Sequence, residues 1–285
     1  MQEYTCSPHL DFYIDEKIRE PDLEMGSSHT HHKYELYYQV AASRRYFIED
    51  AAYVVNAGNL VLIGENQIHK TGPLGDGPTT RVVCNFSQVY LKEISEAFPQ
   101  LDFFSFLDDG QTHLLTTLSV KQQNQVYTML KKMLSIQGDS PRSQAARKLQ
   151  LATLLLQLQD LCEAQRMLGG ESGRITNRIV NQVQGYVTEH YSEKLTLTGI
   201  AGRFYISPYY LSRLFKKTIN LSLIEYINGV RIKAAQHLIE TTTKSIASVA
   251  EETGFTTSAH FRRVFKEATG FSPQQYRQYI RHLNK

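Results

Sequence analysis

Two related stretches near the end of the chain decide the fold of that half: HFRRVFKEATGFSPQQYR at residues 260–277 and YLSRLFKKTINLSLIEYI at residues 210–227. At an offset of 50 residues, identical side chains coincide within these stretches and just beyond them, namely Arg213/Arg263, Phe215/Phe265, Lys216/Lys266, Ser222/Ser272, Tyr226/Tyr276 and Arg231/Arg281. Two copies are too few for a solenoid. They indicate a duplicated module.

Each copy has the pattern of a helix-turn-helix. In the first copy a short amphipathic helix precedes a turn, and Ser207 with Pro208 makes a favourable start for a second helix. In the second copy Gly254 supplies the tight turn. Two helices joined by a few turn residues predict helix-turn-helix units at about residues 195–219 and 244–270.

The exposed face of each second helix is basic. The i, i+3, i+4 spacing buries Leu211, Leu214 and Phe215 in the first copy, and Phe261, Val264, Phe265 and Ala268 in the second. The residues left outside are Tyr209, Ser212, Arg213 and Lys216 in the first copy, and Ser258, Arg262, Arg263 and Lys266 in the second. Arginine reads guanine bidentately, while lysine and hydroxyl groups hold phosphates. These faces therefore predict binding to the major groove of double-stranded DNA.

The second copy, IASVAEETGFTTSAHFRRVFKEATGFSPQQYR, closely resembles the signature of the AraC/XylS family of transcription regulators. The resemblance covers the last hundred residues strongly and the rest more loosely. It implies two helix-turn-helix units bridged by a long helix from about Leu223 to Glu240, and DNA contacts from Tyr209, Ser212, Arg213, Arg262 and Arg263. The first unit departs from the family pattern, because Asn220 and Leu223 stand where glycine and proline are common.

Composition and charge divide the chain of 285 residues into two unlike parts. Residues 171–285 hold 16 Lys+Arg against 8 Asp+Glu, a net charge of +8, whereas residues 1–170 hold 15 against 20, a net of −5. This split favours a polyanion as the partner of the second part. No apolar run is long enough to span a bilayer, and the three cysteines are scattered, so we expect a cytoplasmic protein without membrane contact.

The first part of the chain predicts a small β domain followed by helices. Short aromatic and β-branched segments fill residues 29–90, with a glycine- and proline-rich loop at residues 72–78, which is typical of a sandwich or barrel. Helical periodicity follows at residues 91–168. Its apolar stripe comprises Leu149, Leu151, Leu154, Leu155 and Leu158. These helices are long for the sheet beside them, which suggests a homodimer.

The segment SHTHHKYELYY resembles the metal pattern of the cupin fold, which is HxH, three or four residues, then Glu, with a distant His. Here the four candidate ligands are His29, His31, Glu35 and His69. Such a set could bind Fe(II), Mn(II), Ni(II) or Zn(II). AraC-type regulators generally use this domain as a metal-free effector pocket, so we expect no metal and no other cofactor. The same four residues, with Tyr37 and Arg45, are then candidate effector-binding residues.

The sequence thus predicts an α+β multidomain protein that is a regulator and not an enzyme. The predicted parts are a cupin-like β-barrel or sandwich (residues 1–90), a helical dimerisation segment (91–166), a linker (167–174) and an all-α DNA-binding domain (175–285). The expected partners are promoter DNA, a small-molecule effector with a sugar as the first expectation, a second copy of the chain, and RNA polymerase. The alternative is a metal-dependent cupin sensor, or an enzyme fused to a DNA-binding domain.

Overall fold

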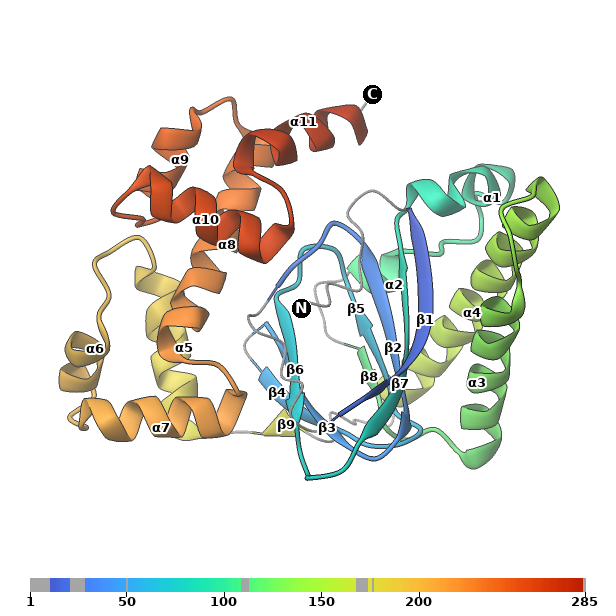
Figure 1. Ribbon diagram of the computed structural model, residues 1–285, viewed down its shortest axis with the longest axis horizontal. Helices are drawn as coiled ribbons and strands as arrows, with labels where there is room; N and C mark the ends of the chain where they lie inside the picture. The colour runs from blue at the N-terminus through green and yellow to red at the C-terminus, as the bar shows by residue number, and fades with distance from the viewer. Residues whose placement is uncertain are drawn as a thin grey trace.

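A β-sandwich lies between two groups of helices (Figure 1). The computed structural model describes residues 11–20, 29–49, 51–108, 113–167, 174–175 and 177–283. On one side of the sandwich lie α3 (Val120–Ser135) and α4 (Pro141–Met167), and on the other side lie the helices from residue 178 onward. The predicted architecture, a β-sheet domain with helices followed by a helical domain, is confirmed.

The first sheet is antiparallel and has the spatial order β1-β7-β2-β5-β8. Its strands are β1 (Phe12–Arg19), β2 (Tyr34–Ala41), β5 (Leu60–Ile63), β7 (Thr79–Phe86) and β8 (His113–Leu115). The central strand β2 places Leu36 opposite Cys84 of β7 and Leu62 of β5. These strands are rich in aromatic, leucine and β-branched residues, a composition that suits a sheet packed on both faces.

The second sheet is antiparallel with the order β6-β3-β4-β9, formed by β3 (Arg44–Ile48), β4 (Ala51–Val55), β6 (His69–Pro73) and β9 (Arg174–Ile175). Alternate side chains of both sheets meet in the interior of the sandwich. Tyr37, Val61 and Val83 come from the first sheet, and Tyr46 and Tyr53 come from the second. The opposite residues of each strand face outward and contact helices.

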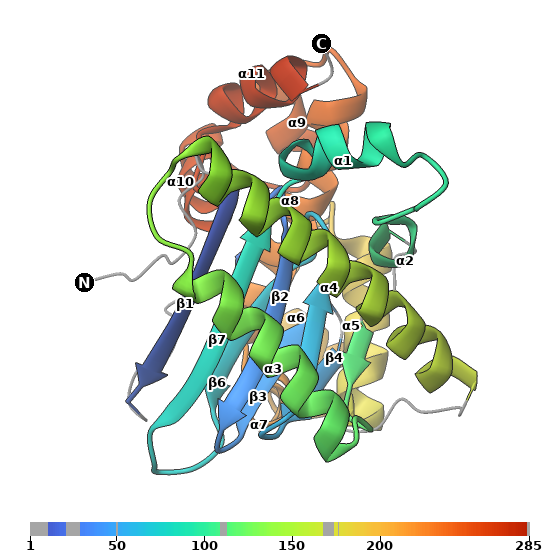
Figure 2. The same ribbon diagram turned by 90° about the vertical axis from the view of Figure 1, so that its right-hand side faces the viewer.

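Helices cover the outer face of the first sheet (Figure 2). Short elements, η1 (Val89–Leu91), α1 (Lys92–Ala97) and α2 (Ser105–Asp108), lead into α3 and α4. A capping box at Ser119 and Gln122 begins α3. The apolar stripe predicted on α4 is largely confirmed, because Leu151, Leu154, Leu155 and Leu158 are buried against the sheet and α3. Leu149 is the exception and is 60% exposed.

The C-terminal part contains the two predicted helix-turn-helix units. Its helices are α5 (Arg178–His190), α6 (Leu197–Arg203), α7 (Pro208–Ile219), α8 (Leu223–Thr241), α9 (Ile246–Glu252), α10 (Ser258–Thr269) and α11 (Pro273–Leu283). Helices α6 and α7 form the first unit, α9 and α10 form the second, and α8 is the predicted bridge. The hydroxyl groups of Ser207 and Thr257 cap α7 and α10 by accepting N–H bonds from Tyr210 and His260.

Left-handed backbone positions fix the turns of these units. Gly254 has φ +81°, and a Cβ there would lie 2.7 Å from the carbonyl oxygen of Tyr191, so the second turn requires glycine. Asn220, at a position where the resemblance stated above implies glycine, ends α7 in the same left-handed region with φ 60°. Asparagine is the side chain that tolerates this conformation best after glycine. The substitution therefore leaves the helix end intact.

The C-terminal helices pack against the outer face of the second sheet. Phe47, Ala52 and Ile68 of the sandwich share one apolar core with α5, α6, α7 and α8. Lys70 of β6, almost fully buried, forms an ion pair of 3.2 Å with Glu225 at the start of α8. Further along α8, Gln236 donates a hydrogen bond to Asn66. The C-terminal helices are thus docked on the sandwich over the length of α8.

Several local predictions are corrected by the structure. Gly72 and Pro73, predicted in a loop, belong to β6, and β8 interrupts the region predicted as helical. The predicted linker at 167–174 is narrower than expected, because Met167 ends α4 and Arg174 pairs with β4 through β9. Residues 168–173 lie outside the described residues. Short edge strands escape prediction because long-range pairing, and not local composition, holds them in place.

Two further sequence expectations concern the membrane and the cysteines. Among the described residues, no helix combines the length and the apolar character that a membrane span requires. Cys84 and Cys162 are buried in the core between the first sheet and its helices. Cys6 lies outside the described residues.

The docked interface contains one carboxyl group with an unusual titration. The carboxylate oxygen Oε2 of Glu65 lies 3.4 Å from Nε2 of His32. Burial, followed by the charges of Asp108 and Glu240, raises the pKa of Glu65 from its ordinary value of 4.5 to about 7. Between these two values the folded protein holds the proton more tightly than the unfolded chain does. The free energy of unfolding therefore falls as the pH rises through this window.

Replacing this carboxyl by a neutral group tests that dependence. In a Glu65→Gln variant the decline in unfolding free energy between about pH 5 and about pH 7.5 is expected to become shallower, because no charge forms beside Asp108 and Glu240. Urea unfolding at several pH values measures it. Glu163→Gln, at an exposed position of α4, is the matched control. If the unfolding free energy of Glu65→Gln declined with pH as steeply as that of the native chain, the raised pKa of Glu65 would not be the cause of the decline.

Candidate functional site

Three histidines and one glutamate converge at the edge of the sandwich. His29 and His31 belong to residues 29–33, here called the strap segment, Glu35 is on β2, and His69 begins β6. Each residue offers one ligand atom, and these atoms all lie within 4.8 Å of one another. The convergence predicted from sequence is present, although only His29 of the strap segment forms a β-bridge, with His69, and the strand itself begins at Tyr34.

Backbone carbonyls fix the tautomers of two of these histidines. His31 Nδ1 lies 3.0 Å from the carbonyl oxygen of Lys33, and His69 Nδ1 lies 2.9 Å from that of Gln67. A carbonyl oxygen only accepts, so both Nδ1 atoms carry the proton. The two Nε2 atoms then face Glu35 Oε2, at 3.4 Å from His31 and 3.7 Å from His69. Glu35 Oε1 accepts a hydrogen bond of 2.7 Å from the Tyr46 hydroxyl.

The protonation states follow from burial and from the charge of Glu35. Burial lowers the pKa of His29 well below the ordinary histidine value, and it also lowers that of His31. For His69 the Glu35 carboxylate outweighs burial, and its pKa is raised. For Glu35, burial is outweighed by His69 and His31, so its pKa lies well below the usual range and the group is a carboxylate.

The interior cavity beside this cluster is small. It has a volume of about 20 Å³ and is lined by Arg19, His29, Glu35, Tyr37, Tyr46, His69, Thr71, Arg81 and Val83. A space of that size holds a water molecule or an ion. The Tyr37 hydroxyl, predicted from strand parity to face this interior, donates to Gln39. Among the described residues, the side chains around this cavity leave no room for a sugar.

Arg45 is the predicted pocket residue that the structure places elsewhere. On β3, Tyr46 and Ile48 point into the interior, while Phe47 points to the C-terminal helices. Arg45 shares the outward parity of Phe47 and lines neither cavity of this region. Tyr46, one position along, is the residue that reaches Glu35. The one-residue error arises because the sequence does not state which face of a two-faced buried strand points inward.

The donor set suits a divalent transition metal. Three imidazole nitrogens and one carboxylate oxygen are ligands for Mn(II), Fe(II), Ni(II) or Zn(II). The protonated Nδ1 atoms of His31 and His69 are held by carbonyl oxygens, which is the outer-shell arrangement that orients metal-binding histidines. His29 Nδ1 and His69 Nε2 are buried, and neither has a hydrogen-bond partner among the described residues. The residues therefore fit the group that the cupin resemblance implies.

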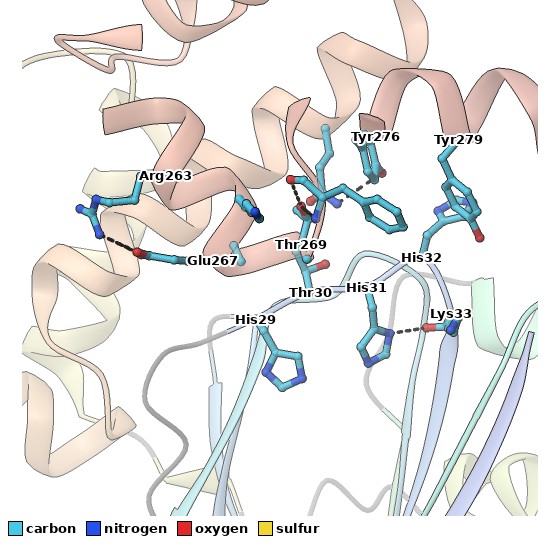
Figure 3. A pocket seen from close by; sticks show the side chains of 15 residues that line it. His29, Thr30, His31, His32, Lys33, Arg263, Glu267, Thr269, Tyr276 and Tyr279 are labelled. Atoms are coloured by element: carbon cyan, nitrogen blue, oxygen red, sulfur yellow. Dashed lines mark hydrogen bonds and ion pairs between the residues drawn. The ribbon is translucent and has the colours of Figure 1, made fainter. Parts of the chain in front are cut away.

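A larger pocket opens on the other side of the strap segment, between the sandwich and the second helix-turn-helix unit (Figure 3). Its volume is about 460 Å³. The strap segment forms one wall, and the other is formed by Gln236, Arg263, Lys266, Glu267, Ala268, Thr269, Gly270, Phe271, Tyr276 and Tyr279. Phe271 and Tyr279 stack at 5.3 Å between ring centroids. Sequence reasoning missed this pocket because its walls are separated by more than two hundred residues.

The strap segment also contacts the second unit directly. The buried backbone N–H of Thr30 donates a hydrogen bond of 2.9 Å to the carbonyl oxygen of Ala268, in the last turn of α10. Asn66 connects the same regions, because its N–H donates to the His31 carbonyl and its side-chain oxygen accepts from Gln236 of α8. The ring of His32 meets the ring of Tyr279 edge-on. The histidine cluster and the end of α10 are therefore neighbours through one short segment.

The predicted DNA-facing side chains of the first unit point away from its core. Tyr209, Arg213 and Lys216 are exposed, and Ser212 is partly exposed, whereas Leu211 and Phe215 on the opposite face are fully buried. Arg213 lies against Tyr209, with its guanidinium carbon 5.6 Å from the ring centroid and Nη1 3.2 Å from the hydroxyl oxygen. This contact holds the arginine extended along the exposed face.

The second unit repeats the arrangement with one difference. Arg262, Arg263 and Lys266 are exposed on α10, and Phe261 and Phe265 are buried beneath them, while Ser258 is partly exposed. Arg263 forms an ion pair of 2.8 Å with Glu267, one turn later on the same helix. The i, i+4 spacing of this pair is visible in the sequence and is the spacing at which opposite charges meet on a helix surface. Both residues line the large pocket.

Comparisons with known proteins match both parts of the chain. The model of the AraC-like ligand binding domain matches residues 18–159, and a helix-turn-helix domain model matches residues 200–279. The regulator YijO of Escherichia coli is 34% identical over 137 residues, which cover 48% of this chain and 47% of YijO. The Msm operon regulatory protein of Streptococcus mutans is 38% identical over 110 residues, covering 39% and 40%.

The matched regions span less than half of each of these two relatives. Among solved structures, ToxT of Vibrio cholerae is 13% identical over 95% of this chain and 99% of ToxT, with a TM-score of 0.41. One family model matches the segment that forms the sandwich with its helices, and the other matches the duplicated helix-turn-helix. Together they show that the chain belongs to the AraC/XylS family of transcription regulators.

Proposed function

We propose that the chain is a sequence-specific regulator in which residues 175–285 bind promoter DNA, while residues 1–90 with the helices of 91–166 sense a small effector. The observation that carries this proposal is the pair of basic helix faces on α7 and α10, each backed by a buried aromatic core. Helix α8, with 19 residues, spans about 28 Å between the two units. That length is compatible with recognition helices in successive major grooves, about 34 Å apart.

Within these faces we assign base reading to arginine and backbone binding to the other groups. Arg213 on α7 and Arg263 on α10 occupy equivalent positions of the repeat, which places them at the same point of each recognition helix. Arg262 lies beside Arg263. Phosphate contacts suit the hydroxyl and ammonium groups on the same faces, namely those of Tyr209, Ser212, Lys216, Ser258 and Lys266. Binding of Arg263 to a base requires that it leave its ion pair with Glu267.

Substitution of the two equivalent arginines tests this assignment. Arg263→Ala and Arg213→Ala are each expected to weaken specific binding by about 1–3 kcal/mol and to relax preference at one base pair. The two relaxed positions should lie one helical turn of DNA apart. Fluorescence anisotropy with a randomised set of operator duplexes measures both effects. Arg142→Ala, exposed on α4, is the control. Equal weakening on every sequence would assign the arginine to phosphate instead.

For the effector we propose the pocket of about 460 Å³ between the sandwich and the second unit. Its volume is in the range of pockets that hold small organic ligands, whereas the interior cavity of about 20 Å³ is far below it. Stacked aromatic rings and several polar side chains suit a sugar, the effector class expected from the family. Arg263 and Lys266 line the same pocket, so an occupant changes the surroundings of residues assigned to DNA.

A thermal-shift screen against sugars and small metabolites tests this site. A compound that raises the Tm of the native chain should produce less than half of that shift in a Tyr279→Ala variant, because Tyr279 forms the aromatic wall with Phe271. Phe98→Ala, at an exposed position after α1, should keep the full shift. A compound whose shift is equal in both variants binds elsewhere and contradicts the pocket assignment.

We also propose that the chain forms a homodimer through the helical segment and acts together with RNA polymerase. The exposed Leu149 on the outer side of α4 supports the dimer, because the neighbouring leucines are already buried against the sheet. A dimer would double the number of DNA contacts and raise occupancy through effective concentration. Sedimentation velocity of the full chain, giving a mass near 32.6 kDa or twice that value, decides between monomer and dimer.

A further inference from the structure

The strap segment joins a set of converging ligand atoms to a recognition helix. We propose that His29, His31, Glu35 and His69 bind one divalent first-row transition metal ion, and that the metal-bound form holds the second helix-turn-helix unit docked on the sandwich, in a state of lower DNA affinity. The DNA effect rests on the proposed function, whereas the metal site and the docking do not.

The hydrogen bonds of the cluster call for a cation at its centre. Because the carbonyl oxygens of Lys33 and Gln67 engage Nδ1 of His31 and His69, the neutral rings present only lone pairs at Nε2. Both lone pairs point toward the negatively charged Oε2 of Glu35. Lone pairs facing a carboxylate repel unless a positive charge lies between them. A proton on one imidazole supplies that charge to a single pair, whereas a metal ion supplies it to all of these ligand atoms together.

The size of the site agrees with an ion. Metal–ligand bonds to histidine and carboxylate are about 2.0–2.2 Å, so ligand atoms on opposite sides of a metal lie about 4–4.4 Å apart. The ligand atoms of the cluster lie within 4.8 Å of one another, which side-chain shifts of well under about 1 Å bring into range. Only Glu35 contributes a negative charge, so the loaded site carries a net charge of +1 beside the docked helices.

Coupling to the recognition helix follows from the order of residues in the strap segment. Two of the four ligands, His29 and His31, flank Thr30, whose N–H is bonded to the Ala268 carbonyl at the end of α10. A metal that fixes both flanking side chains fixes the backbone between them. The His31 carbonyl is also held by Asn66, which contacts Gln236 and Tyr276. Metal binding thus stabilises the backbone of the strap segment, which is hydrogen-bonded to the second unit through Thr30.

The docked state opposes DNA binding because it fixes the position of α10 and leaves Arg263 paired with Glu267. Arg263 and Lys266 line the pocket whose other wall is the strap segment, and Arg263 is paired with Glu267. The first unit is held on the second sheet by a shared apolar core, so docking both units also fixes the angle between α7 and α10. The basic side chains of α10 are exposed in the docked state, so what release of the strap segment changes is the angle of α10 relative to α7, which can then fit a second groove.

Metal binding is tested first without DNA. The untagged full chain, stripped with a chelator, is titrated with Mn²⁺ and with Zn²⁺ and analysed by calorimetry and elemental analysis. One ion per chain is expected, with affinity reduced at least 100-fold in His31→Ala and in Glu35→Gln. His237→Ala, which removes an exposed histidine of α8, should bind as the native chain does. No binding, or equal binding by His31→Ala, overturns the metal site.

Docking is tested by hydrogen exchange and by a variant that uncouples the strap segment. Metal should slow amide exchange at Thr30 and in the last turn of α10 in the native chain. Thr30→Pro removes the N–H donor and keeps all four ligands, so it should bind metal without slowing exchange in α10. Asn66→Gly, which keeps the left-handed backbone of that residue (φ 60°), is a second uncoupling variant. Metal binding without any change in exchange in the native chain overturns the coupling.

Measurement of operator affinity with and without metal shows whether metal weakens or strengthens DNA binding. Metal should weaken operator binding by the native chain about 5-fold or more, and it should have little effect in Thr30→Pro. By reciprocity, DNA should weaken metal binding by the same factor. Stronger DNA binding with metal overturns the inhibitory direction. A chain that binds no DNA in either form contradicts the proposed function, while metal stoichiometry and hydrogen exchange still decide the site and its docking.

Discussion

A single buried carboxylate organises the junction between the two halves of this protein. Glu35 lies inside the sandwich, where an isolated charge would be strongly destabilising, and it is matched by the Tyr46 hydroxyl on one oxygen and by two histidines on the other. The contacts of Glu35 with His31 and His69 place His31 of the strap segment against β2 and beside His69. The same segment then reaches α10 through Thr30. The environment of one side chain is therefore linked to the position of a recognition helix.

Apolar packing supports this junction on both sides. Strand alternation gives each sheet an inner face and an outer face, and the outer faces are covered by different helices, α3 and α4 on the first sheet and α5 to α8 on the second. Because Phe47 and Ile68 share a core with the first helix-turn-helix unit, that unit is tied to the sandwich by burial. Among the described residues, the buried apolar cluster of the second unit includes no residue of the sandwich, and Thr30 contacts this unit by a hydrogen bond to Ala268. This difference makes the second unit the easier one to release.

The C-terminal half could be predicted almost completely from sequence. Helix periodicity, the cap at Ser207, the glycine at 254 and the repeat at an offset of 50 are local signals, and each agrees with the structure. The sandwich was predicted with less detail. The predicted loop at residues 72–78 includes the last two residues of β6, and the predicted helical region includes β8, because β6 and β8 are held by long-range pairing with β3 and β5. Arg45 was assigned to the inner face although Tyr46 occupies it.

The sequence by itself determined the family, the duplicated DNA-binding module, the exposed basic side chains and the candidate ligands, since all of these depend on residue type and short spacing. Only the tertiary structure decided how these parts meet. It reduced the interior cavity to the size of an ion and placed an organic-sized pocket between the halves. It also put Thr30 against Ala268, two residues 238 positions apart. Such contacts arise from the packing of whole elements, which local sequence patterns do not encode.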